Sequence, residues 1–175
     1  LTALPIPLLP MIRSEFGLDY AQSGLVVSAF TLAYGIGQVP AGWLTDRIGA
    51  RIVITLGIGG VALAGILVGL SYTYLVLLVF MALKGVMGGG YHPAAPPIIA
   101  ASVEPTHRGR ALGLHMIGGS SSYFLAPLAA AAIATIWGWR GSFIVLAIPT
   151  LIFAVIFYRS LGRVTAARIT GAAAQ

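Results

Sequence analysis

Long apolar runs separated by short polar or charged segments dominate the pattern of this chain. A helix that crosses the roughly 30 Å hydrocarbon core of a bilayer needs about 20 mostly apolar residues. Five runs reach or approach that length, and the short segments between them predict antiparallel neighbouring helices. The five predicted membrane helices comprise residues 21–43, 52–71, 74–101, 111–136 and 143–158.

The other structure that can span a bilayer is a closed β-barrel, whose strands alternate apolar and polar side chains. Residues 61–70 and 75–83 are apolar almost throughout and show no such alternation. We therefore predict an all-α, polytopic integral membrane protein folded as a helical bundle in the lipid bilayer.

The two ends of the chain differ from the five runs. Residues 1–10 are apolar but too short to cross a membrane, and we expect them to be part of a first helix whose start is missing. From residue 161 the composition shifts to arginines and small residues, which is typical of a polar connector. We therefore expect residues 1–160 to form a transmembrane bundle and residues 161–175 to begin a cytoplasmic connector, so that the chain is a fragment of a longer protein.

Arginines accumulate on one side of the predicted bundle. If successive helices alternate in direction, seven arginines share one side, whereas Arg13 and Arg140 fall on the other. Cytoplasmic loops are enriched in basic residues, so the richer side is expected to be cytoplasmic, together with the carboxyl terminus, in a plasma or inner membrane. The seven arginines are Arg47, Arg51, Arg108, Arg110, Arg159, Arg163 and Arg168.

Composition excludes several function classes. Only 8% of the residues are charged and 58% are hydrophobic, whereas soluble domains carry about 25% charged residues. The net charge of +6 comes from basic residues that flank apolar runs, so we expect no nucleic-acid binding. The chain has no cysteine, its histidines are widely spaced, and serines 120–122 lack an acid to orient His115. We therefore expect no enzyme activity, no cofactor and no metal.

Polar residues inside the apolar runs are candidates for a solute pathway. Lys84 lies about ten residues into its run, or about 15 Å deep at 1.5 Å per residue. A charge at that depth marks a functional site by default, although a structural partner in the bundle is the alternative. The other candidates, for which close helix packing is the alternative, are Tyr34, Gln38, His92, His115 and Ser122.

The run of residues 74–101 contains a predicted break. Glycines at 88–90 precede His92, and prolines follow at 93, 96 and 97. Proline removes a backbone donor and clashes with the preceding turn, so the helix should bend or open here. Carbonyl groups freed in this way are expected to line a cavity.

The segment between the first two runs, GWLTDRIGAR at residues 42–51, resembles the GxLxDRxGxR signature of the major facilitator superfamily of secondary transporters. It departs at Ala50, where many members carry a further basic residue. Lys84 and Gly88 resemble a basic residue and a glycine on the family's fourth helix, and GYHPAA, PTHRGRALG and GWRGSF also resemble family segments. The matching positions of the signature are Gly42, Leu44, Asp46, Arg47, Gly49 and Arg51.

The resemblance covers the whole chain and implies the amino-terminal six-helix half of a twelve-helix major facilitator fold. It implies alternating access, in which two halves rock around a central site. It also implies a gate at residues 42–51, where Asp46 pairs with neighbouring arginines in one state and releases them in another; a topological anchor is the alternative. Residues 52–71 and 143–158, which are almost uniformly apolar, are expected at the lipid-facing rim.

The charged groups inside the runs indicate the charge of the transported solute. No Asp or Glu lies within the five runs, whereas Lys84, His92 and His115 can carry positive charge. We therefore expect a symporter or antiporter of a small organic anion, with protons as candidate coupling ion because histidine titrates near neutral pH. A drug and proton efflux antiporter is an alternative, as is a truncated fragment that only packs in the membrane. Most glycines of the antiporters' glycine-rich motif are serine or alanine in this chain. The positions that match the motif are Gly113, Ser122, Ala126, Pro127, Ala130 and Ala131.

Overall fold

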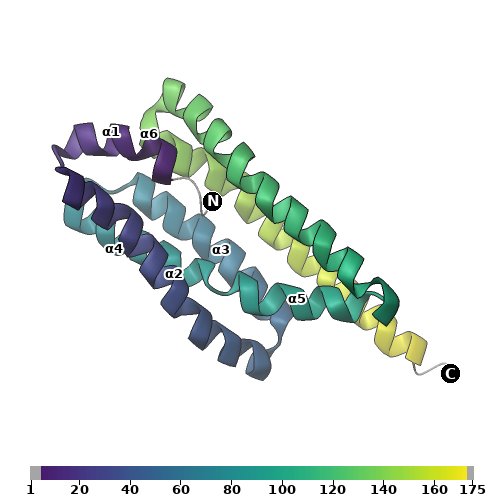
Figure 1. The fold of residues 1–175 in the computed structure, drawn as a ribbon. Coiled ribbons are helices and arrows are strands. Elements are labelled where there is room, and N and C mark those ends of the chain that lie inside the picture. Colours follow the sequence, from purple (N-terminus) through teal and green to yellow (C-terminus); the bar gives the residue numbers. More distant parts are fainter. Residues whose placement is uncertain (1–4, 173–175) are drawn as a thin grey trace.

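The computed structural model describes the backbone of residues 5–172 and the side chains of residues 6–162. All regular structure in this range is helical (Figure 1). The helices are α1 (Pro5–Phe16), α2 (Tyr20–Ile48), α3 (Ala50–Gly69), α4 (Tyr74–Gly88), α5 (Tyr91–Ser102), the 3₁₀ turn η1 (Pro105–His107) and α6 (Arg108–Ala172). α6 consists of two helices that meet at Gly138, so we describe its first half, residues 108–137, and its second half, residues 139–172, separately.

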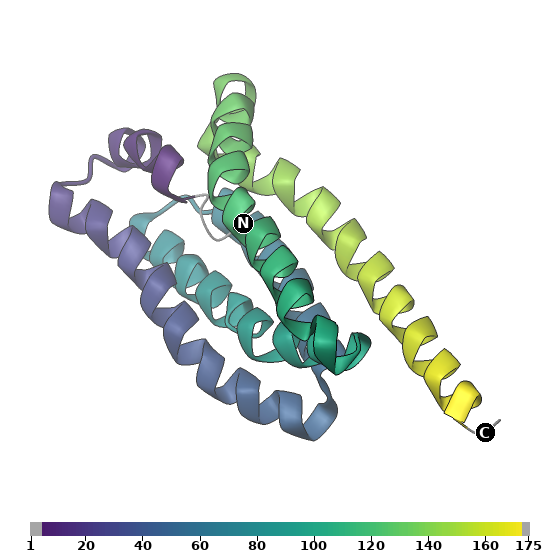
Figure 2. The ribbon, with the colours of Figure 1, turned by 45° about the vertical axis from the view of Figure 1, so that its right-hand side comes forward.

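Four helical stretches are long and apolar enough to cross a membrane, as judged by length and composition. The last stretch has 58 residues and turns back on itself at Gly138, so its two halves run in antiparallel directions (Figure 1) and separate with distance from the kink (Figure 2). The predicted all-α bundle of membrane-length helices is therefore confirmed. The four stretches are Tyr20–Ile48, Ala50–Gly69, Tyr74–Ser102 and Pro105–Gly162.

The connections between helices gather at two opposite ends of the bundle (Figure 1). The turns at residues 17–19 and 70–73 lie at the same end as the kink at Gly138, and we call this the kink end. The turn at Gly49, residues 103–107 and the last residues of α6 lie at the other end, which we call the Gly49 end.

The observed helix boundaries differ from the predicted ones where a reversal needs fewer residues than we expected. α2 continues to Ile48 instead of stopping at residue 43, because Gly49 alone makes the turn with a φ of 89°. Gly138 plays the same part in α6 with a φ of 66°, and glycine adopts such positive φ values without steric cost. α1 extends to Phe16, beyond the expected residues 1–10, and the expected connector from residue 161 is helical to Ala172. Residues 1–4 and 173–175 lie outside the described residues.

The predicted break in the third run is confirmed. α4 ends at Gly88 and α5 begins at Tyr91, so that Gly89 and Gly90 separate two helices within one membrane-length stretch. All three glycines at this break are buried against neighbouring helices. Residues without side chains thus lie where α2 and α3 meet the break between α4 and α5.

α2 and α4 pack along a seam of glycines. A Cβ atom on Gly85 would collide with the carbonyl oxygen of Phe30, and one on Gly37 would lie 2.8 Å from the carbonyl oxygen of Val86. Small residues allow the backbones of membrane helices to approach closely, which increases van der Waals contact. This glycine seam fixes α2 against the α4 side of the break.

α3 lies in the centre of the described bundle and keeps an exposed apolar strip at Ile52, Leu56 and Leu63, so its position at the lipid-facing rim stays a prediction. It packs against α4, α5 and α6, and half of the residues in its most apolar segment are buried. Gly65 and Gly69 lie directly under the backbone of the second half of α6, near Phe143 and Arg140. A uniformly apolar sequence does not distinguish contact with lipid from contact with protein, so the extent of these contacts between helices was not predicted.

Candidate functional site

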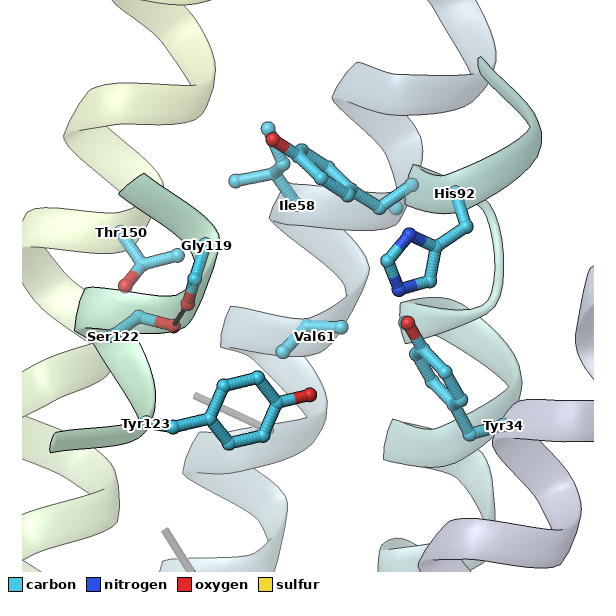
Figure 3. A pocket seen from close by; sticks show the side chains of 11 residues that line it. Tyr34, Ile58, Val61, His92, Gly119, Ser122, Tyr123 and Thr150 are labelled. Carbon is cyan, nitrogen blue, oxygen red and sulfur yellow. Dashed lines mark hydrogen bonds between the residues drawn. The ribbon is translucent and has the colours of Figure 1, made fainter. Parts of the chain in front are cut away.

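A cavity of about 300 Å³ lies between α2, α3, α5 and both halves of α6 (Figure 3). Its apolar surface is formed chiefly by Gly57, Ile58 and Val61 of the central helix α3. Polar side chains enter from the surrounding helices. They are Tyr34, Tyr91, His92, Ser122, Tyr123 and Thr150.

The break between α4 and α5 positions one side of this cavity. Gly88, the last residue of α4, leaves room for the ring of Tyr34, since a Cβ there would lie 3.1 Å from Cδ2 of that tyrosine. Tyr91 and His92 then begin α5 directly after the break. The predicted opening of this helix therefore places two polar aromatic residues at the cavity.

Aromatic rings continue from this side of the cavity in a row that we call the aromatic column, comprising Phe30, Tyr34, His92, Tyr91 and His115. Phe30 stacks on Tyr34 with centroids 5.8 Å apart, and Tyr34 meets His92 edge to face at 5.9 Å. Tyr91 contacts His92 at 5.9 Å and stacks on His115 at 5.7 Å. His115 thus contacts the cavity wall without lining the cavity itself.

Lys84 is fully buried and does not line the cavity. Its Nζ atom lies 5.1 Å from the ring centroid of Phe30 and 4.9 Å from that of Phe143, distances at which a cation attracts an aromatic face. Lys84 thus contacts Phe30, which stacks on Tyr34 of the cavity lining. Gln38, which is half-buried on α2, also lies outside the lining.

The hydroxyl groups at the cavity fall into two kinds. Ser122 Oγ donates to the carbonyl oxygen of Gly119 at 2.6 Å, and Thr150 Oγ1 donates to that of Leu146 at 2.7 Å. The phenol groups of the three tyrosines have no hydrogen-bond partner among the described residues. In Figure 3 the hydroxyls of Tyr34 and Tyr123 both point into the cavity. No Asp, Glu, Lys or Arg belongs to the lining formed by the described side chains.

Half of the polar residues that line the cavity were predicted from the sequence. Tyr34, His92 and Ser122 were candidates, and the fold brings them together from α2, α5 and α6. Tyr91 and Tyr123 were missed, although each directly follows or precedes a candidate in the sequence. Thr150 was missed because it is isolated in a segment expected to face lipid.

The signature turn at residues 42–51 lies at the Gly49 end. Asp46 is exposed and forms no ion pair with any described residue, so the expected pairing with Arg47 or Arg51 is absent from this conformation. The guanidinium of Arg47 stacks 4.1 Å above the ring centroid of Trp43. Arg51 instead donates from Nε and Nη2 to the carbonyl oxygen of Tyr158, at 3.1 and 2.8 Å.

That contact of Arg51 joins the start of α3 to the end of α6. Gly42, on the preceding helix, faces Pro93 of α5, since a Cβ on this glycine would lie 3.9 Å from the proline Cβ. The turn therefore contacts α5 and α6 through its glycine and its second arginine, while its carboxylate faces outward.

A second polar cluster lies at the kink end, and we call its members Glu15, Ser71, Trp139 and Arg140 the kink-end cluster. Trp139 Nε1 donates to Glu15 at 2.6 Å, and Arg140 forms an ion pair with the same carboxylate. Arg140 Nη2 also donates to the carbonyl oxygen of Ser71 at 2.7 Å. The hydrogen bond from Arg140 holds the pKa of Glu15 below its usual range. The cluster ties together the end of α1, the α3–α4 turn and the kink of α6.

Comparison with known proteins links this arrangement to transporters. Residues 1–174 match the sequence profile of the Major Facilitator Superfamily. The chain is 29% identical over 147 residues to the "Probable L-galactonate transporter" of Escherichia coli K12, covering 84% of this chain and 32% of that protein. It is 33% identical over 155 residues to "Multidrug resistance protein MdtG" of Citrobacter koseri, covering 86% and 38%. The chain thus spans about a third of the length of these relatives.

The fold also matches a solved structure, a bacterial homolog to the human lysosomal transporter Spinster in an inward-facing and occupied conformation. The TM-score is 0.73 at 22% sequence identity, and the match covers 90% of this chain and 41% of the other. At this level of identity the likeness establishes a shared fold.

Proposed function

Because this chain belongs to the Major Facilitator Superfamily, we propose that it forms the amino-terminal six-helix half of a secondary transporter that moves a small organic anion by alternating access. The chain is an integral membrane protein of a transporter family, and it is not an enzyme. The observation that carries the proposal is the cavity between α2, α3, α5 and α6. In such transporters two halves rock around a central site.

The size and lining of the cavity support a small anionic solute. A volume of about 300 Å³ is at the lower end of the range of small-molecule sites, roughly 300–1,000 Å³. Its described lining offers phenol and imidazole groups and no carboxylate that would repel an anion. The similarity to an L-galactonate transporter points to the same class of solute.

A drug and proton antiporter is the second candidate, and the similarity to a multidrug resistance protein favours it. Most of the antiporters' glycine-rich motif is replaced by serine and alanine, which favours the anion transporter. Uptake of an organic anion and efflux of a cationic dye are therefore the two activities to compare.

We assign the pathway first to Tyr34, His92 and Ser122, which line the cavity. Lys84 and His115 are assigned an indirect part, since each contacts a residue of the aromatic column. Gln38 lies on α2 one turn beyond Tyr34, and we place it in the same pathway outside the cavity. Protons are the proposed coupling ion.

The gate is assigned to the turn at residues 42–51. An exposed Asp46 without an ion pair to the described residues is available to a cationic group of the other half of the proposed transporter. Arg51 holds the turn against α6, and Gly49 makes the reversal. The proposed gate comprises Gly42, Asp46, Arg47, Gly49 and Arg51.

The proposed orientation places the Gly49 end and the carboxyl terminus in the cytoplasm, in a plasma or inner membrane. Five of the arginines counted for that side lie at or near the Gly49 end, while the side chains of Arg163 and Arg168 lie outside the described residues. Arg13 and Arg140 lie toward the kink end. This distribution supports the orientation because cytoplasmic segments are enriched in basic residues.

The cavity can be tested by filling it. Gly119 lines the cavity and Gly118 does not, yet a Cβ on either would have no atom within 4 Å. In the complete transporter reconstituted into liposomes, Gly119→Leu should lower the uptake of radiolabelled galactonate at least about tenfold, because the leucine occupies the solute volume. The matched variant Gly118→Leu should keep most of the activity.

Two results would contradict the proposal. Equal uptake by both glycine variants would show that the solute does not use this cavity. Efflux of ethidium without uptake of any organic anion would favour the drug antiporter.

A further inference from the structure

The side of the cavity formed by α6 offers hydrogen-bond acceptors. Ser122 and Thr150 each have one hydroxyl proton, and each donates it to a carbonyl oxygen of its own helix. Their oxygens keep lone pairs that can accept a further hydrogen bond. A solute hydroxyl group that reaches Ser122 or Thr150 can therefore donate to its oxygen.

The opposite side of the cavity offers donors. Tyr34 from α2 and Tyr91 from α5 have phenol protons without a partner among the described residues, and His92 lies between their rings. Tyr123, which follows Ser122 on α6, directs a third such phenol into the cavity from the α6 side (Figure 3). A carboxylate only accepts hydrogen bonds, and bonds to an ionised group are stronger than neutral ones. This side therefore suits a carboxylate.

We propose that the cavity selects hydroxy acids, binding the carboxylate at Tyr34 and His92 and a hydroxyl group at Ser122 and Thr150. This inference rests on the proposed transport of an organic anion and narrows its substrate class. A carboxylate without a hydroxyl would leave the two acceptor oxygens desolvated and unpaired, which costs affinity. A neutral polyol would lack the charge that strengthens the bonds to the phenols.

The discriminating ligands are pairs that differ only in hydroxyl groups: glycolate with acetate, lactate with propionate, and galactonate with hexanoate. Their binding to the complete transporter in detergent is measured by titration calorimetry. At least one hydroxy acid should bind about tenfold or more tightly than its hydroxyl-free counterpart, as expected for one or two hydrogen bonds. Galactitol, which has hydroxyls and no carboxylate, should bind more weakly than galactonate.

Two neighbouring serines supply the matched variants. Ser121 also donates to a carbonyl oxygen of its own helix, that of Ile117 at 2.8 Å, but it does not line the cavity. Ser122→Ala should remove most of the preference for the hydroxy acid while leaving the hydroxyl-free acid unchanged. Ser121→Ala removes an equivalent helix hydrogen bond and should leave both affinities unchanged.

The donor side is tested with Tyr34→Phe, which removes the phenol and keeps the ring that contacts Phe30 and His92. This variant should weaken both members of a pair by a similar factor, because both carry the carboxylate. Binding of galactitol should weaken by a smaller factor, because its bonds to the phenol are not strengthened by a charge.

The outcomes separate this inference from the proposed function. If organic anions bind but no pair shows a preference, or if the two serine variants behave alike, the inference is overturned and anion transport stands. If no anion binds at all, the proposed function fails and the inference fails with it.

Discussion

The two ends of the bundle use arginines and a carboxylate in opposite ways. At the kink end, Glu15 is bonded by Trp139 and Arg140, whose positions in the chain are more than a hundred residues away. At the Gly49 end, Asp46 is exposed and has no ion pair with the described residues, while Arg51 binds a carbonyl oxygen of α6. At the kink end the carboxylate is therefore bound by other residues of the chain. At the Gly49 end a carboxylate of similar type is available to bind a further partner.

This difference indicates which end can exchange partners. The carboxylate of the kink-end cluster already has donors, so a new partner would have to displace them. Asp46 would lose only contacts with solvent on binding a cation. We therefore expect the kink end to be the fixed end of this half and the Gly49 end to be the one that engages the rest of the transporter.

The largest expected effect concerns the side of the membrane on which each end lies. The chain has no cysteine, so a single introduced cysteine reports its own position. Tyr72 at the kink end and Thr106 at the Gly49 end are both exposed. In intact cells an impermeant maleimide should label Tyr72→Cys and leave Thr106→Cys unlabelled until the membrane is opened. The reverse pattern would exchange the two assignments and place Asp46 outside.

The next largest effect is on stability at the kink end. Arg140→Gln removes the ion pair with Glu15 and the hydrogen bond to Ser71. Because the Glu15 carboxylate and the Ser71 carbonyl lose this partner, we expect the unfolding free energy to fall by about 1–3 kcal/mol. Thermal unfolding in detergent measures it.

The control for this change is Arg47→Gln at the Gly49 end, where the guanidinium stacks on the exposed ring of Trp43. Its cost should be smaller, about 0.5–1 kcal/mol. Equal destabilisation by the two variants would remove the distinction between a fixed end and an available end.

A moderate effect is expected on transport from the Gly49 end. Asp46→Asn should change the unfolding free energy by less than about 0.5 kcal/mol, because the side chain is exposed and has no ion pair with the described residues. In the complete transporter it should alter the transport rate several-fold, because it shifts the balance between inward-open and outward-open states. The rate at which a soluble maleimide labels Gly119→Cys in the cavity reports that balance. Unchanged labelling together with unchanged transport would reduce the turn to a topological anchor.

The smallest expected effect is acid sensitivity at the kink end. The lowered pKa of Glu15 means that its carboxylate stabilises the folded state above its unfolded pKa of about 4.3. This contribution is lost as pH falls through the lower, folded pKa. The stability difference between the native protein and Glu15→Gln should therefore be at most about 1 kcal/mol at pH 7, since the pair is partly exposed, and should vanish in stronger acid. A difference that persists there would show that the ionised carboxylate is not its source.

The helices and the break were predictable because their signals are local. Apolar runs give membrane helices, and the glycines and prolines around His92 give an opening between α4 and α5. The loops predicted around Gly49 and Gly138 were too long, since one glycine of positive φ reverses the chain at each position.

The arrangement of side chains was less predictable because it depends on contacts between distant segments. Glu15 and Arg140 meet only after α1 and α6 are packed, and no spacing in the sequence indicates their pairing. Lys84 was predicted deep in the bilayer, but its position between Phe30 and Phe143 depends on three helices. The central position of α3 follows from what surrounds it rather than from its own apolar sequence.

The glycine seam between α2 and α4 has a consequence for movement. Helices separated by interlocking side chains can shift by exchanging rotamers, whereas Gly37 and Gly85 bring backbone atoms against backbone atoms, which have no rotamers to exchange. We therefore expect α2 and α4 to move together as one rigid body whenever this half tilts. The backbone must then bend at another position. Gly49, the single-residue link between α2 and α3, is positioned to act as a hinge.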